Sequence, residues 1–311
     1  MQVSVVVCTH EPARYDALAE AADSVLEGTY DDVELVLVSD GSESVRERME
    51  RDYGDHPAVR VETLTENRGL LAARNAGASA ASGEFVAFLD DDAVAHEDWL
   101  ARLMEAVEAR DRLAVGGRMV PKWVAGRPDF LPEEFYFLIG VVGRGFGPGG
   151  NPDTEGEVRN GFGSNIAFDA EVFAELGGFE PDVGGRKGDK QLQGGETELS
   201  ARFRAMYGEG VWYVPDAVVE HKIYSYRTDP VWLIRRAFMQ GVSKRGMERF
   251  APEATGAERT FLARLVREYI PDRVARLIRA PSRDEGAQLL FLFILTAAVG
   301  LGYLYGEVYW R

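Results

Sequence analysis

The feature that most constrains the fold is a regular alternation of short apolar segments and amphipathic helical patterns over the first 120 residues. The strand-like segments are residues 3–9, 33–40, 58–64 and 84–90. The helical patterns between them are residues 13–27, 43–53 and 69–81. Strands that are apolar along their whole length are typical of parallel sheets covered by helices on both faces. The sequence therefore predicts an α/β fold built around a mostly parallel sheet.

Polar side chains follow three of these four strands at the point where each strand ends. They are the stretches Thr9 to Glu11, Asp40 to Ser42 and Asp90 to Asp92. In open parallel sheets, ligands bind at the carboxyl ends of the strands. The three stretches therefore predict one shared binding site.

The adjacent carboxylates Asp90, Asp91 and Asp92 repel one another at a partly shielded strand end. A divalent cation such as Mg²⁺ or Mn²⁺ removes that repulsion and can hold a nucleotide diphosphate at the same time. The alternative is an acidic turn in which Asp98 caps the next helix. A dinucleotide-binding oxidoreductase is disfavoured, because no glycine occurs in "CTHEPARY" after the first strand.

The rest of the chain is less regular. Strands are expected at 113–120, 162–168 and 210–222, with helices near 169–176, from Glu196 and again from Asp229 onward. The basic run "RKGDK" at 186–190 either clamps an anionic substrate or forms a solvated loop.

The segment 287–305 carries no charge and would form a helix of roughly 28 Å, close to the thickness of the hydrocarbon layer of a bilayer. Arginines precede it and aromatic residues follow it, as expected of a membrane anchor. The alternatives are a buried core helix and a helix that pairs with a partner chain. We expect a catalytic domain at 1–225, a helical, basic, membrane-proximal region at 226–284 and a hydrophobic segment at 285–311.

The net charge of −16, from 51 acidic and 35 basic residues, disfavours binding to nucleic acid. It is typical of a protein from a salt-rich cytoplasm, such as that of a halophilic archaeon. No signal peptide is recognisable in "MQVSVVV". The expected location is therefore the cytoplasmic face of the cell membrane.

Seven motifs together resemble glycosyltransferase family 2. They are "VSVVVCTH", "VLVSDGS", "NRGLLAARNAG", "GEFVAFLDDDAV", "GSNIAF", "LGGFE" and "GGETELSAR". The resemblance implies a GT-A fold with a Rossmann-like nucleotide-binding half and an inverting enzyme that uses nucleotide-diphosphate sugars. The C-terminal part resembles haloarchaeal members that build lipid-linked glycans for protein N-glycosylation.

The resemblance also implies roles for individual residues. Glu196 matches the general base, although the family commonly has Asp at that position. The nucleotide-binding positions are Thr9, Glu11, Asp40, Gly69, Arg74 with Asn75, Asp90 and Lys222. The metal ligands are Asp92, Asp90 and His221. Arg74 could instead lie on a helix surface, and His221 could be a structural residue.

The function expected from this resemblance is transfer of a hexose or hexuronic acid to a dolichyl- or polyprenyl-phosphate-linked saccharide or to a lipid phosphate. The expected donor is a UDP-sugar. A polysaccharide synthase is one alternative, although its Gln-x-x-Arg-Trp element and multiple membrane helices are not found in the sequence. A catalytically inactive binding subunit of a glycan assembly complex is the other.

Overall fold

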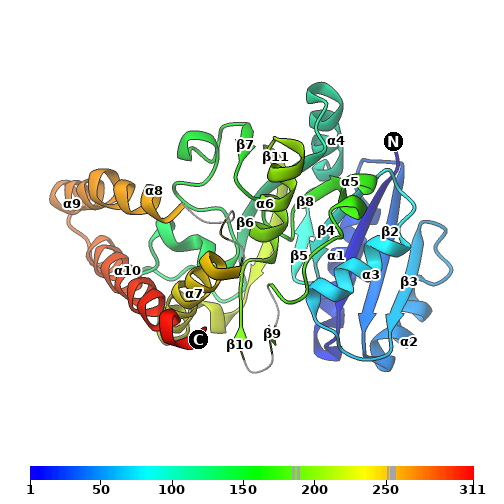
Figure 1. Ribbon diagram of the computed structural model, residues 1–311, viewed down its shortest axis with the longest axis horizontal. Helices are drawn as coiled ribbons and strands as arrows, with labels where there is room; N and C mark the ends of the chain where they lie inside the picture. Colours follow the sequence, from blue (N-terminus) through cyan, green and yellow to red (C-terminus); the bar gives the residue numbers. More distant parts are fainter. Residues whose placement is uncertain (184–185, 188–189, 251, 253–256) are drawn as a thin grey trace.

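The computed structural model describes residues 1–183, 186–187, 190–250, 252 and 257–311. Nine of its strands form one sheet in the order β3-β2-β1-β4-β8-β6-β11-β5, and β7 pairs with β11 (Figure 1). These strands are β1 (Val3–Thr9), β2 (Val33–Asp40), β3 (Val59–Leu64), β4 (Phe85–Asp90), β5 (Ala93–Ala95), β6 (Ala114–Trp123), β7 (Gly156–Val158), β8 (Ile166–Asp169) and β11 (Val211–Ile223). A separate pair is formed by β9 (Arg186–Lys187) and β10 (Lys190–Gln191). The side chains of the basic run at 186–190 lie outside the described residues.

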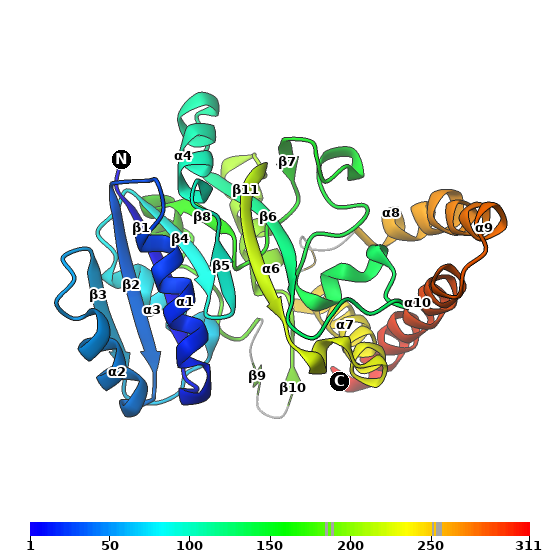
Figure 2. The ribbon, with the colours of Figure 1, turned by 180° about the vertical axis from the view of Figure 1, so that it is seen from behind.

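The N-terminal half confirms the predicted parallel sheet. Strands β1 to β4 pair in parallel, and side chains alternate between its two faces. Val5 faces the core formed with α1 (Tyr15–Leu26) and α2 (Glu43–Tyr53), whereas Val6 faces the core formed with α3 (Leu70–Ala80). Figure 2 shows α1 lying across the strands. Because both faces are covered, β1, β2 and β4 are almost entirely buried and mostly apolar, whereas the edge strand β3 is partly exposed and carries Arg60 and Glu62.

The second half of the sheet mixes strand directions. Strands β6 and β11 are parallel, while β8 runs antiparallel to both β4 and β6. The short strand β5 pairs antiparallel with β11, and this pairing was not predicted from the sequence. The helices that follow the first half are α4 (Trp99–Arg110), α5 (Ala170–Glu175) and α6 (Gly195–Tyr207). Single 3₁₀ turns or short 3₁₀ helices are η1 (Pro12–Arg14), η2 (Glu133–Ile139), η3 (Pro148–Gly150) and η4 (Ser225–Thr228).

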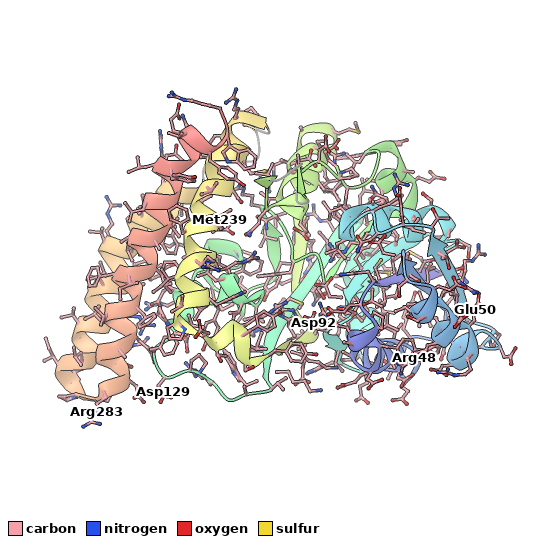
Figure 3. All side chains as sticks on the ribbon, turned by 90° about the horizontal axis from the view of Figure 1, so that it is seen from below. Arg48, Glu50, Asp92, Asp129, Met239 and Arg283 are labelled. Atoms are coloured by element: carbon pink, nitrogen blue, oxygen red, sulfur yellow. The ribbon has the colours of Figure 1, made fainter. Side chains whose placement is uncertain are left out.

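The C-terminal region is helical, as predicted. It comprises α7 (Pro230–Phe250), α8 (Ala257–Arg264), the π-helical turn η6 (Leu265–Tyr269), α9 (Ile270–Arg279) and α10 (Arg283–Tyr309). Helix α10 lies beside α7 over much of its length (Figure 3). Gly302 lies against the backbone of Phe238 and Gly306 against that of Val242, so the two helices run in the same direction with their backbones in close contact.

Helix α10 is long and apolar enough to cross a membrane by length and composition, and it is the one helix of that kind among the described residues. Only 22% of its most apolar window is buried in the protein. The buried stripe includes Leu292, Leu295 and Ala298, which join the main core. The buried Arg273 on α9 also donates hydrogen bonds to Glu134 of η2, the shortest at 2.6 Å. The C-terminal helices are therefore packed firmly against the rest of the protein.

Candidate active site

The turn with the three carboxylates is held between two strands. Asp90 ends β4, and β5 begins at Ala93. Ala93 is paired with His221 of β11, and the backbone N–H of Lys222 donates to the carbonyl oxygen of Asp92 at 2.8 Å. The pairing of β5 with β11 therefore places His221 next to Asp92, although the two residues are far apart in the sequence.

Asp90, Asp92 and His221 form a group whose ligand atoms all lie within 4.8 Å of one another. The Nδ1 atom of His221 is 3.0 Å from the carbonyl oxygen of Ile139, which can only accept a hydrogen bond. Nδ1 therefore carries a proton, and Nε2, which lies 3.2 Å from Oδ1 of Asp92, accepts a hydrogen bond from the guanidinium of Arg227 at 3.1 Å. Carboxylates and an imidazole fixed in this orientation by a backbone carbonyl fit a divalent cation such as Mn²⁺ or Mg²⁺.

Two arginines balance the buried carboxylates. The guanidinium of Arg14 lies 2.7 Å from both Asp91 and Asp92, and that of Arg227 lies 3.3 Å from Asp92. Burial acts to raise the pKa of Asp92, but the contact with His221 and the charges of Arg227 and Arg14 outweigh burial and hold this pKa well below its usual range. Burial raises the pKa of Asp91 to about 6 despite Arg14. Asp92 is thus kept ionised, as a metal ligand must be.

Thr9 donates a hydrogen bond of 2.6 Å to Asp91. Because both Thr9 and Arg14 contact Asp91, the middle carboxylate ties the loop after β1 to the loop after β4. This leaves the two outer carboxylates, Asp90 and Asp92, on the side of His221.

Arg74 connects the carboxylate cluster to Glu196. Its side chain is only 2% exposed, and it donates to Asp90 at 2.6 Å and to Glu196 at 3.1 Å. Burial acts to lower the pKa of Arg74, but the two carboxylates raise it above its usual value. A Cβ atom at Gly163 would overlap both Glu196 and Arg74, so the glycine allows the loop before β8 to approach them. Glu196 lies in the first turn of α6 and remains 29% exposed.

A further arginine, Arg236 on α7, lies near this cluster. Its Nε atom is buried and has no hydrogen-bond partner within the described part of the chain. Burial and the nearby charge of Arg227 lower its pKa, while Glu196 acts in the opposite direction. Arg236 is therefore a cationic group available to an anion that binds beside Glu196.

The remaining predicted residues have other contacts. Both carboxylate oxygens of Asp40 accept backbone N–H groups, from Arg68 at 2.8 Å and from Gly69 at 2.9 Å. Gly69 has a φ of +88°, which allows the chain to enter α3 at this point. Glu11 is exposed in the loop after β1.

Lys222 does not reach the carboxylate cluster with its side chain. Its ammonium lies 2.5 Å from Glu20 of α1. Asn75, expected beside the nucleotide, instead holds the backbone of Phe179 with hydrogen bonds of 2.7 and 2.8 Å. The structure therefore brings together Thr9, Arg74, Asp90, Asp92, Glu196 and His221.

Three arginines of this site, Arg14, Arg227 and Arg236, were not predicted from the sequence. Arg14 follows the polar loop after β1 closely enough that its position could have indicated a role. Arg227 and Arg236 lie in a helical region rich in arginine, where no spacing separates them from surface residues.

The chain belongs to glycosyltransferase family 2. The model of this family, described as glycosyl transferase family 2, matches residues 4–177. This range contains strands β2 to β8, nearly all of β1, and the three adjacent carboxylates Asp90, Asp91 and Asp92.

A glucosyl-dolichyl phosphate glucuronosyltransferase of Haloferax volcanii is 44% identical over 98% of this chain and 96% of its own length. Succinoglycan biosynthesis protein ExoM of Rhizobium meliloti is 26% identical over 67% of this chain and 62% of its own length. Among solved structures, a mannosyltransferase of Pyrobaculum calidifontis in complex with GDP-Man and Mn²⁺ aligns with a TM-score of 0.63 at 22% identity, over 98% of this chain and 87% of that one. This likeness confirms the predicted fold.

Proposed function

We propose that this glycosyltransferase transfers a hexuronic acid from a UDP-sugar, with inversion, to a saccharide linked to a dolichyl or polyprenyl phosphate. The observation that carries the proposal is the 44% identity, over almost the full length of both chains, with the Haloferax volcanii enzyme named for glucuronosyl transfer to glucosyl-dolichyl phosphate. The arrangement of Asp90, Asp92, His221 and Glu196 supports the reaction.

In the proposed reaction, a hydroxyl oxygen of the acceptor forms a bond to the anomeric carbon while the bond from that carbon to the diphosphate breaks. Glu196 accepts the hydroxyl proton, and Arg74 holds the Glu196 carboxylate in place. A divalent cation held by Asp90, Asp92 and His221 would neutralise charge on the leaving diphosphate. Thr9 and Asp40 hold the loops that form the nucleoside side of the site.

Arg236 supports a hexuronic acid as the transferred sugar. A neutral hexose gives this guanidinium no charged partner, whereas the C6 carboxylate of a hexuronic acid would bind it in a charge-assisted hydrogen bond. Because Arg236 is close enough to Glu196 to interact with its charge, a sugar whose anomeric carbon lies near Glu196 would extend toward it.

Transfer assays with the full-length protein at high salt test the proposal. UDP-glucuronic acid and UDP-glucose would be compared in the presence of Mn²⁺, with glucosyl phosphate on a short polyprenyl chain as acceptor. Arg236→Gln should lower kcat/KM for the uronate donor about 10- to 100-fold more than for the hexose donor. Arg235→Gln, which alters the exposed neighbour of Arg236, is the control.

An equal loss for both donors would contradict the role of Arg236. Transfer of no sugar to the lipid-linked acceptor by the parent protein would contradict the proposed function itself.

The same proposal includes attachment to the cytoplasmic face of the membrane through the C-terminal helices. Residues 226–311 contain 14 basic and 9 acidic residues in a chain that is otherwise strongly acidic. Helix α10 exposes Leu301 and Leu304, at 61% and 68%. Since α7 lies in contact with α10 and carries Arg235 and Lys244, we infer that α10 lies in the membrane interface instead of crossing the bilayer.

A further inference from the structure

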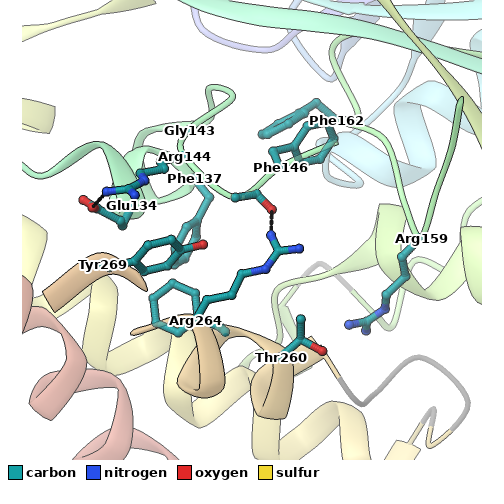
Figure 4. Close-up of a pocket in the computed structure, with 12 residues that line it drawn as sticks. Glu134, Phe137, Gly143, Arg144, Phe146, Arg159, Phe162, Thr260, Arg264 and Tyr269 are labelled. Carbon is teal, nitrogen blue, oxygen red and sulfur yellow. Dashed lines mark hydrogen bonds and ion pairs between the residues drawn. The ribbon is translucent and has the colours of Figure 1, made fainter. Parts of the chain in front are cut away.

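A pocket of about 600 Å³ lies between the loops after β6 and the segment formed by α8 and η6 (Figure 4). Its volume is in the range of small-molecule binding sites. The walls are mainly aromatic and include Phe137, Phe146, Phe162, Phe261 and Tyr269. Three arginines and one carboxylate also line the pocket, namely Arg144, Arg159, Arg264 and Glu134.

The pocket adjoins the candidate active site along two loops. Phe162 lines the pocket, and the next residue, Gly163, lies against Glu196. Phe137 also lines it, and two residues later the carbonyl oxygen of Ile139 accepts the hydrogen bond from His221. A ligand in the pocket would therefore lie within reach of the proposed base.

The pocket is on the opposite side of the carboxylate cluster from the predicted nucleotide site. The nucleotide is expected at the ends of β1 and β2, whereas α8 lies beyond β6 and β11, at the far end of the molecule (Figure 1). The same segment of α8 and η6 exposes Leu262 and Val266, at 51% and 67%. The pocket thus lies between the proposed base and an apolar surface of the C-terminal helices.

The arginines of the pocket differ in how their charges are balanced. Arg144 is paired with Glu134 at 3.3 Å and with Asp272. Arg264 instead donates to two carbonyl oxygens, those of Gly145 at 3.1 Å and Gly149 at 2.7 Å. Figure 4 shows Arg264 extending into the pocket between Tyr269 and Phe146. A guanidinium that contacts carbonyl oxygens among aromatic walls suits a phosphate joined to an apolar chain.

We propose that this pocket binds the phosphodiester and the first isoprenoid carbons of the lipid-linked acceptor, with Arg264 as the phosphate ligand. This inference rests on the proposed function and identifies the acceptor side of the same site. The sugar of the acceptor would point past Phe162 toward Glu196, and the isoprenoid chain would leave along Leu262 and Val266 toward the membrane.

The test compares two acceptors with UDP-glucuronic acid as donor: glucosyl phosphate on a short polyprenyl chain, and an alkyl glucoside of similar length without phosphate. Arg264→Gln should raise KM for the phosphate acceptor roughly 10- to 100-fold, the range for loss of a charge-assisted hydrogen bond. KM for the donor and for the alkyl glucoside should change less than threefold, roughly the spread expected of a site that is not touched. Arg267→Gln, which alters an exposed arginine on η6 outside the pocket, is the matched control.

A second variant covers the case in which Arg264→Gln disturbs the loop at 145–150. Thr260→Trp would fill the pocket from α8 without removing any contact of Arg264, and it should weaken binding of the polyprenyl acceptor while leaving donor hydrolysis unchanged. Thermal unfolding of each variant reports on folding. Equal increases in KM for both acceptors in Arg264→Gln, or normal polyprenyl transfer by a folded Thr260→Trp, would overturn the inference. If the parent protein glycosylates neither acceptor, the proposed function has failed and not the assignment of the pocket.

Discussion

Arg74→Lys is the substitution whose effect follows most directly from the structure. The guanidinium of Arg74 donates to Asp90 and Glu196 through two different nitrogen atoms. A lysine has one ammonium on a flexible stem and cannot hold both carboxylates in the same geometry. The charge at the site is preserved, so the variant separates the bridging role of Arg74 from its charge.

The expected cost is that of about one charge-assisted hydrogen bond, ~1.5–3 kcal/mol. The side chains of Asp90 and Glu196 are 27% and 29% exposed, so water partly replaces the lost donor. We therefore expect the free energy of unfolding to fall by about 1.5–2 kcal/mol. Because base catalysis contributes about 10²–10⁴-fold, release of Glu196 should lower kcat about 100-fold.

Denaturant unfolding and steady-state kinetics measure the two effects separately. KM for the donor should change little, since Asp92 and His221 keep their contacts. Arg102→Lys is the control. The Arg102 side chain on α4 is 48% exposed and forms an ion pair with Asp98, so this variant should change the unfolding free energy by less than about 0.5 kcal/mol. An Arg74→Lys variant with the kcat of the parent would refute the idea that the bridge positions Glu196.

Three further predictions concern other parts of the molecule. His221→Gln should raise the Mn²⁺ concentration needed for half-maximal transfer about tenfold or more, and an unchanged Mn²⁺ titration would exclude His221 from the metal site. Removal of metal by EDTA should abolish transfer by the parent protein. Burial acts to raise the pKa of Glu34, but the hydrogen bonds that Glu34 accepts from the Ser4 hydroxyl and the Ser82 N–H lower this pKa below its usual value. The contribution of these hydrogen bonds to the free energy of unfolding should therefore be present at neutral pH and lost as the pH falls below about 4. Glu34→Gln should therefore cost about 1–2 kcal/mol in denaturant unfolding at pH 7 and less near pH 3, and a cost that does not depend on pH would contradict this. Replacing Leu301 and Leu304 together by Gln should weaken sedimentation with anionic lipid vesicles by at least about tenfold, whereas Met206→Gln, at an exposed position on α6, should not.

The sequence by itself determined the part of the sheet formed by β1 to β4, and it predicted a cation at the carboxyl edge of that sheet. Buried parallel strands must be apolar on both faces, so β1, β2 and β4 are recognisable without a partner. Each ends at its carboxyl edge in polar residues, and the acidic Asp90 to Asp92 indicated a cation. These signals are local, because they depend only on neighbouring residues in one strand and the turn after it.

The tertiary structure decided which distant residues complete the site. His221 meets Asp92 through the three-residue strand β5, which is too short to show a period in the sequence. Lys222, its neighbour, reaches Glu20 instead, because successive side chains of a strand point to opposite faces of the sheet. Arg74 bridges Asp90 and Glu196, which is 122 residues away, and only the position of α3 relative to α6 and β4 sets that distance. Contacts of this kind depend on the position of whole elements in space, and no pattern along the chain contains that information.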